Sequence, residues 1–139
     1  MNFVPDQCRI SLDRRLLPGE DPNTVWQGYA TLIESLRPDI ANLDFTLDAP
    51  AIADAALETP TNSTVVRTAQ QVLAALDLDP QPCGVPFGSD ASKLSRQGVP
   101  SVVFGPGSID RAHAAIEYVE CDQVVTASAF YRRFLEQFQ

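Results

Sequence analysis

Apolar and polar side chains alternate over two segments of the chain, which is the pattern of a half-buried β-strand. Over residues 8–15, apolar positions 8, 10 and 12 are interleaved with polar positions 9, 11 and 13. The alternation returns over residues 43–48. Residues 101–104 form a short, mostly apolar run that is followed by a Gly-Pro-Gly turn. These segments predict three strands, the last of them buried.

Helical spacing of apolar residues replaces this alternation elsewhere. Asp21 is a good helix cap and Pro22 suits a first helical position, so a helix is predicted from there to about Leu36. A second helix is predicted to begin at a cap, Asn62 or Ser63, and to end before the Asp-Pro pair at residues 79–80. Its apolar face is expected to consist of Val65, Val66, Ala69, Val72, Leu73 and Leu76.

Two further helices are predicted after this point, a short one at residues 91–96 and a last one after Asp122. The last helix is expected to carry one apolar face, formed by Val124, Ala127, Tyr131, Leu135 and Phe138. Strands and helices thus follow one another in a mixed order. This order predicts an α/β fold with a division near residue 50.

Composition excludes several classes of protein. The net charge of −8 argues against nucleic-acid binding, which needs clustered Lys and Arg. No apolar run approaches the ~20 residues of a membrane helix and the N-terminal residues do not have the pattern of a signal peptide, so a cytoplasmic protein without membrane partners is expected. The three cysteines form no Cys-x-x-Cys pair and are expected to be small buried residues in a reducing compartment.

His113 is the only histidine, and it follows the Gly-Pro-Gly turn beyond the third predicted strand. Loops after strand ends are where α/β proteins bind ligands, so a metal or catalytic role competes here with a plain surface role. A zinc site takes about three or four protein ligands, and neither a His-x-x-x-His nor a cysteine pair is present. His113 alone is therefore insufficient to hold a catalytic metal.

Two polar groups suit the binding of substrate. Asn2 and Arg15 flank the first predicted strand, and an amide with a planar guanidinium can grip a carboxylate. The alternative for Arg15 is a surface ion pair with Asp13 or Glu20.

The Gly-Ser-Asp-Ala-Ser turn at residues 88–92 is open to two interpretations. It caps the short helix through Asp90, or it lines a pocket with the hydroxyls of Ser89 and Ser92. Neither serine is flanked by the residues of a nucleophile elbow.

Taken together, these motifs resemble one family, the zinc-dependent metallopeptidases and amidohydrolases that include acetylornithine deacetylase, succinyl-diaminopimelate desuccinylase, aminoacylase and glutamate carboxypeptidase. The resemblance rests on several linked stretches in the same order: NFVP at residues 2–5, SLDRRLLPGED at 11–21, PFGSDASKL at 86–94, GVPSVVFGPG at 98–107, and the His113 segment that ends in EYV at 117–119.

The resemblance implies a fold and a function. Residues 1–50 would be part of a split β-α-β lid, through which the intact family forms homodimers, and residues 51–139 the C-terminal part of an α/β catalytic domain. Asn2 and Arg15 would hold the substrate carboxylate, Ser89 and Ser92 would contact substrate, and His113 would be the last ligand of a two-metal site. Zinc is the expected metal, with cobalt or manganese as possible substitutes. The reaction would be cleavage of the amide bond of an N-acyl amino acid or small peptide.

Much of that family's catalytic apparatus is not found in this sequence. The other metal ligands and the general-base glutamate precede the lid in the family, and no His-x-Asp or Asp-Glu-Glu motif replaces them. Ala114 and Ile116 also stand where a threonine and an acidic residue are common. The chain is therefore expected to be the C-terminal portion of such an enzyme and inactive alone. The alternatives are a non-catalytic carboxylate-binding or dimerisation module derived from the family, and an unrelated small α/β domain.

Overall fold

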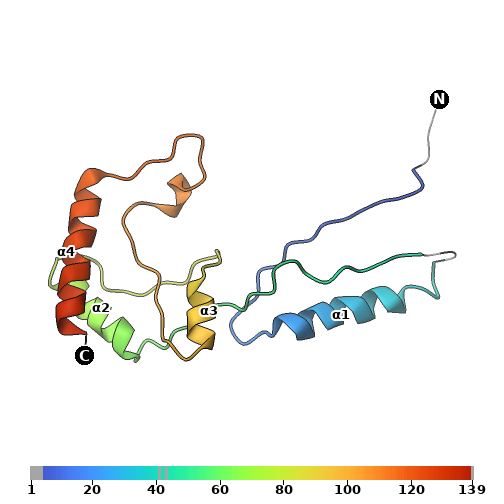
Figure 1. Ribbon diagram of the computed structural model, residues 1–139, viewed down its shortest axis with the longest axis horizontal. Helices are drawn as coiled ribbons and strands as arrows, with labels where there is room; N and C mark the ends of the chain where they lie inside the picture. The colour runs from blue at the N-terminus through green and yellow to red at the C-terminus, as the bar shows by residue number, and fades with distance from the viewer. Residues whose placement is uncertain (1–4, 41, 43, 139) are drawn as a thin grey trace. The chain divides into compact units, whose positions relative to one another are not determined.

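The computed structural model describes residues 5–40, 42 and 44–138, and it divides into two compact units, Met1–Ala56 and Leu57–Gln139 (Figure 1). The first unit contains helix α1, Pro22–Ser35. The second contains α2, Thr64–Ala74, α3, Ala91–Arg96, the 3-10 helix η1, Ile109–Arg111, and α4, Cys121–Gln137. The assignment of these units to a lid and a catalytic domain stays a prediction.

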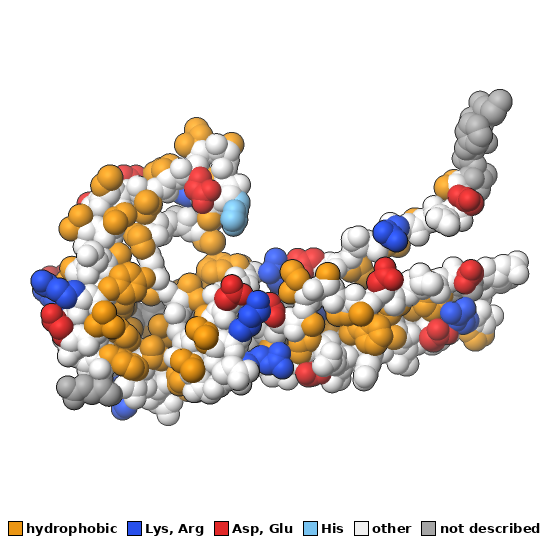
Figure 2. All heavy atoms as spheres, in the orientation of Figure 1, with side chains coloured by type: hydrophobic (Ala, Val, Ile, Leu, Met, Phe, Trp, Pro, Cys, Tyr) orange, Lys and Arg blue, Asp and Glu red, His pale blue; other side chains and the backbone are white. Residues whose placement is uncertain are grey.

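Helix α1 begins and ends where the sequence predicts. The Asp21 carboxylate accepts a hydrogen bond from the Thr24 backbone N–H at 2.8 Å, Pro22 is the first helical residue, and Leu36 is the C-cap. No residue of α1 is buried, and its hydrophobic side chains form part of the visible surface (Figure 2). The helix is tethered to the following segment by Trp26, whose Nε1–H donates to the Asp48 carbonyl at 3.3 Å.

The segments predicted as strands form no β-ladder among the residues that the structure describes. Residues 8–15 are exposed throughout, with Ile10 at 77% and Leu12 at 79%. The expectation of burial at residues 101–104 is wrong for this chain, because Val102 is 37% and Val103 53% exposed. A strand becomes buried only when neighbouring strands pair with it and helices cover it. The α/β fold class thus stays a prediction.

The core of the second unit lies where α2 and α4 pack against each other (Figure 1). Its buried members are Ala69, Val72 and Phe130, and half-buried side chains surround them. This packing confirms the apolar face predicted for α2, since three of its predicted members, Val66, Ala69 and Val72, are buried.

The face predicted for α4 is largely wrong. Of its predicted members only Ala127 is buried, whereas Tyr131 is 45% and Leu135 75% exposed. The helix instead buries Phe130, which stacks on Phe134 with ring centroids 5.8 Å apart. Apolar residues occupy more than one side of α4, so periodicity alone did not select the side that contacts α2.

The described residues include no helix long and apolar enough to cross a membrane. The expectation of buried cysteines is wrong, because Cys8, Cys83 and Cys121 are all exposed. Cys8 lies in the exposed segment before α1, and Cys121 is the first residue of α4.

Candidate functional site

A tight turn precedes α1 and fixes the chain just after Arg15. The Leu17 carbonyl accepts from the Glu20 N–H at 3.1 Å, with Pro18 and a left-handed Gly19 (φ 86°) between them, as in a type II turn. The Glu20 carboxylate accepts from the Leu17 N–H and from the Arg14 guanidinium, both at 2.7 Å. These two bonds, the backbone N–H first, lower the pKa of Glu20.

Arg15 is open to solvent beside this turn. Its Nη2 lies 3.3 Å from Asp13 Oδ2, and the two side chains are 67% and 77% exposed. The Asp13 pairing foreseen for Arg15 is therefore present, while Glu20 pairs with Arg14 instead. Asn2, the predicted partner of Arg15 in carboxylate binding, lies outside the described residues. An exposed guanidinium with a single ion pair of this length keeps donors for another carboxylate.

The Gly-Ser-Asp turn is stabilised by backbone and serine groups rather than by an aspartate cap. Ser89 Oγ accepts from the Ala91 N–H at 3.2 Å, and the Ser89 carbonyl accepts from the Ser92 N–H at 3.1 Å. Asp90 occupies the N-cap position of α3 but makes no capping bond. Its carboxylate pairs with Lys93 at 2.8 Å, and this bond lowers the pKa of Asp90. The suggestion that the Asp90 side chain caps α3 is wrong, because Asp90 has helical backbone angles (φ −61°, ψ −14°) rather than the extended conformation of a capping residue.

The two predicted serines differ in access. Ser92 is buried, with 3% of its surface exposed, whereas Ser89 is half-buried at the entrance to α3. Ser89 uses its oxygen as an acceptor, so its O–H remains available as a donor to a bound molecule.

His113 stands at the corner of a second tight turn. The Arg111 carbonyl accepts from the Ala114 N–H at 3.4 Å, Ala112 has φ −68° and ψ 135°, and His113 has φ 60°. These values describe a type II turn whose third position, normally glycine, is a histidine. The left-handed conformation costs a non-glycine residue about 1–2 kcal/mol. Backbone strain of this kind is concentrated at functional sites.

The loop that carries His113 is closed at its base. Gly107 has φ 92°, its N–H donates to Gln123 Oε1 at 2.8 Å, and a Cβ at this position would lie 3.4 Å from the Val119 side chain. Within the loop, the Arg111 guanidinium lies over the Tyr118 ring, 5.1 Å from its centroid. The sequence identified His113 but gave no signal for these contacts, because they join residues seven or more positions apart.

The described residues do not assemble a metal site. No group of three or more His, Cys, Asp or Glu side chains among residues 5–40, 42 and 44–138 is arranged to hold a metal ion. Zinc needs about three or four such donors. The donor set present here therefore does not fit a zinc ion, and His113 would be one ligand among donors supplied from elsewhere.

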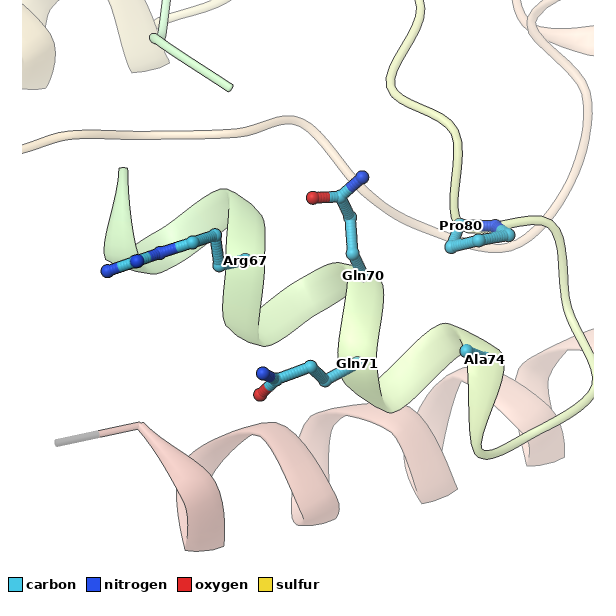
Figure 3. Close-up of a pocket in the computed structure, with 5 residues that line it drawn as sticks. All are labelled: Arg67, Gln70, Gln71, Ala74 and Pro80. Atoms are coloured by element: carbon cyan, nitrogen blue, oxygen red, sulfur yellow. The ribbon is translucent and has the colours of Figure 1, made fainter. Parts of the chain in front are cut away.

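Two surface hollows in the second unit contain none of the predicted site residues. The first, of about 350 Å³, lies along α2 and is lined by Arg67, Gln70, Gln71, Ala74 and Pro80 (Figure 3). The second, of about 400 Å³, lies between the end of α2 and the start of α4, with Leu73, Phe104 and Ala127 among the residues that line it. Arg15 belongs to the first unit, and Ser89, Ser92 and His113 belong to the second.

Comparison with known proteins identifies the family. The model of the family described as peptidase family M20/M25/M40 matches residues 15–137, and the chain belongs to this family. An acetylornithine deacetylase of Myxococcus xanthus is 29% identical over 140 residues, which cover 99% of this chain and 34% of that protein. An N-acetyl-L-citrulline deacetylase of Xanthomonas campestris is 28% identical over 123 residues, 88% of this chain and 32% of that protein. The family predicted from the sequence motifs is thereby confirmed.

The chain spans about a third of the length of the curated relatives that it matches. No solved structure matches it significantly.

Proposed function

We propose that this chain forms the C-terminal part of a metal-dependent hydrolase that cleaves the amide bond of an N-acyl amino acid or small peptide. The family match over residues 15–137 carries the proposal. The names of two relatives, an acetylornithine deacetylase and an N-acetyl-L-citrulline deacetylase, support N-acyl amino acids as the substrate class.

The proposed roles follow the chemistry of each side chain. Arg15 binds the substrate carboxylate together with Asn2, and the exposure of the Arg15 guanidinium supports this role. Ser89 donates its O–H to a substrate oxygen at the turn before α3. The buried Ser92 supports that turn through its backbone N–H, which donates to the Ser89 carbonyl. His113 is a ligand of the catalytic metal, at the exposed corner of its turn.

The chain alone is proposed to be inactive. Its described residues assemble no group of three metal-binding side chains, so the remaining donors and the general base have to come from a further part of the enzyme. Dimerisation through the first unit and the lid and catalytic assignments of the two units belong to the same proposal.

A chimera tests the proposal directly. The third of the Myxococcus acetylornithine deacetylase that aligns with this chain is replaced by this chain, and hydrolysis of N-acetylornithine is measured. We expect activity in the chimera and none in the chain alone, with or without added Zn²⁺. Arg15→Ala should raise KM roughly tenfold or more, because it removes a charged hydrogen bond to the substrate carboxylate. His113→Ala should abolish turnover, because it removes a proposed ligand of the catalytic metal.

The matched control is Arg96→Ala, which removes an exposed arginine at the end of α3 and should leave KM and kcat unchanged. A chimera that melts cooperatively but is inactive with its native Arg15 and His113 would contradict the proposal. Binding of N-acetyl amino acids by the chain alone, without zinc and without turnover, would instead support the carboxylate-binding module.

A further inference from the structure

The loop between Gly107 and Val119 contains a contact that spans the turn of His113. Arg111 precedes the turn and Tyr118 follows it, and the Arg111 guanidinium lies 5.1 Å from the centre of the Tyr118 ring. Both side chains are accessible, with Tyr118 46% exposed. This contact therefore joins the two arms of the loop on the surface, independently of the core between α2 and α4.

Arg111 contributes to the turn a second time through its backbone. Its carbonyl accepts the hydrogen bond from the Ala114 N–H at 3.4 Å that closes the turn around His113. The Arg111 N–H in turn donates to the Ser108 carbonyl at 3.0 Å within η1. The backbone of Arg111 is thus bonded to the residue that directly follows His113.

The turn needs such support because of the residue at its corner. His113 has φ 60°, a conformation that glycine adopts freely and histidine does not. The closing hydrogen bond, at 3.4 Å, is long for an N–H···O bond. A weak bond and an unfavourable dihedral angle leave the turn dependent on contacts outside it.

We propose that Arg111 and Tyr118 are positioning residues, and that their contact holds His113 in the left-handed corner of a preformed turn, ready to bind its ligand. The inference rests on the proposed function only in taking that ligand to be the metal. The conformation of the turn depends only on residues of this chain and can be measured without the metal.

Nuclear magnetic resonance of the whole chain tests the proposal without metal or substrate. In the native chain we expect the close contact between Ala112 Hα and the His113 amide proton that a type II turn produces. Arg111→Ala removes a cation–π contact at an exposed site, so amide exchange at Ala114 should accelerate about two- to fivefold and the turn contact should weaken. Tyr118→Leu should have the same effect.

Conservative variants separate positioning from general stability. Arg111→Lys, which keeps a cation, should restore part of the protection at Ala114, and Tyr118→Phe, which keeps the ring, should restore nearly all of it. The thermal melt of the second unit should be unchanged in all four variants. The matched control is Arg37→Ala, which removes an arginine lying 4.3 Å from the Phe45 ring in the other unit.

Unchanged exchange at Ala114 in both Arg111→Ala and Tyr118→Leu would overturn the proposal. An equal loss of amide protection at Ala114 in Tyr118→Phe and Tyr118→Leu would also overturn it. Faster amide exchange at Ala114 in the Arg37→Ala control would do the same. Because none of these measurements uses activity, a failure here is distinct from a failure of the hydrolase assignment.

Discussion

The rings of Phe104 and Phe130 lie with their centroids 3.9 Å apart, which joins the segment before the Gly-Pro-Gly turn to the middle of α4. Tyr131 strengthens this connection, since its hydroxyl donates to the Phe104 carbonyl at 2.8 Å. Phe104 is only half-buried, whereas Phe130 is 3% exposed and contacts the α2 side of the core. The stability of the second unit should therefore depend strongly on Phe130.

Phe130→Ala should remove most of the stability of the second unit. Deleting a buried phenylalanine side chain costs about 3–5 kcal/mol, and a unit with so few buried residues has little to spare. We expect the cooperative thermal transition, followed by circular dichroism, to disappear. Leu135→Ala in the same helix is the control, because its side chain is 75% exposed and its loss should cost less than about 0.5 kcal/mol. Equal effects of the two variants would contradict the packing of α4.

Alanine at the N-cap should destabilise α1, whose N-cap is Asp21, but not α2, whose N-cap is Ser63. Asp21→Ala removes the acceptor of the Thr24 N–H and should reduce the helicity of α1, at a cost of about 1 kcal/mol. Ser63 makes no capping bond, and its buried hydroxyl oxygen has no hydrogen-bond partner among the described residues. Ser63→Ala should therefore leave the stability of α2 unchanged or raise it. A loss of stability in Ser63→Ala as large as that in Asp21→Ala would show that Ser63 does cap its helix.

Acid should open the turn before α1. The pKa of Glu20 is lowered in the folded chain, first by the Leu17 N–H and then by Arg14, so the carboxylate stabilises the turn above the unfolded pKa of about 4.3. That contribution is lost as the pH falls through the lower folded pKa. Titration of the Glu20 side chain and of the Gly19 amide by nuclear magnetic resonance should give the same midpoint. Arg14→Ala should raise the pKa of Glu20 only part of the way to its ordinary value, since the hydrogen bond from the Leu17 N–H remains. A full return to the ordinary pKa would show that the Leu17 N–H is not the main cause of the shift.

The isolated chain should self-associate or melt at low temperature. Residues 8–15 are exposed throughout, with Leu12 at 79%, and belong to no β-ladder among the described residues. An exposed segment with the alternating sequence pattern of a strand invites pairing with another chain. Sedimentation should show a mass that rises with concentration above the 15.1 kDa of the monomer. Leu12→Lys should reduce association, because it replaces an exposed apolar side chain by a charge. Ser11→Lys is the control: it adds the same charge without removing an apolar group and should reduce association less. A sharp, reversible melt of a monomer at every concentration would refute the prediction.

Local chemistry explains which features of this protein were predictable. The caps and bounds of α1, the helix at residues 91–96 and the buried face of α2 follow from hydrogen-bonding groups and apolar spacing within a few residues. The family also followed from the sequence, because its motifs are short and occur in a fixed order, and the match over residues 15–137 confirms it. The assignments of Asn2, Arg15, Ser89, Ser92 and His113 to a site stay predictions.

The sequence by itself determined where α1, α2 and α3 lie and, to within about two residues, where α4 begins, but it did not predict η1. It also determined which family the chain belongs to and that a lone histidine is insufficient for a metal site. Only the tertiary structure decided that α4 buries Phe130 rather than Tyr131, that the cysteines are exposed, and that Glu20 pairs with Arg14. It also placed Arg111 on Tyr118 across the turn of His113. The physical reason is that propensity and capping act between near neighbours in the sequence, whereas burial and ring packing depend on segments that meet only after folding.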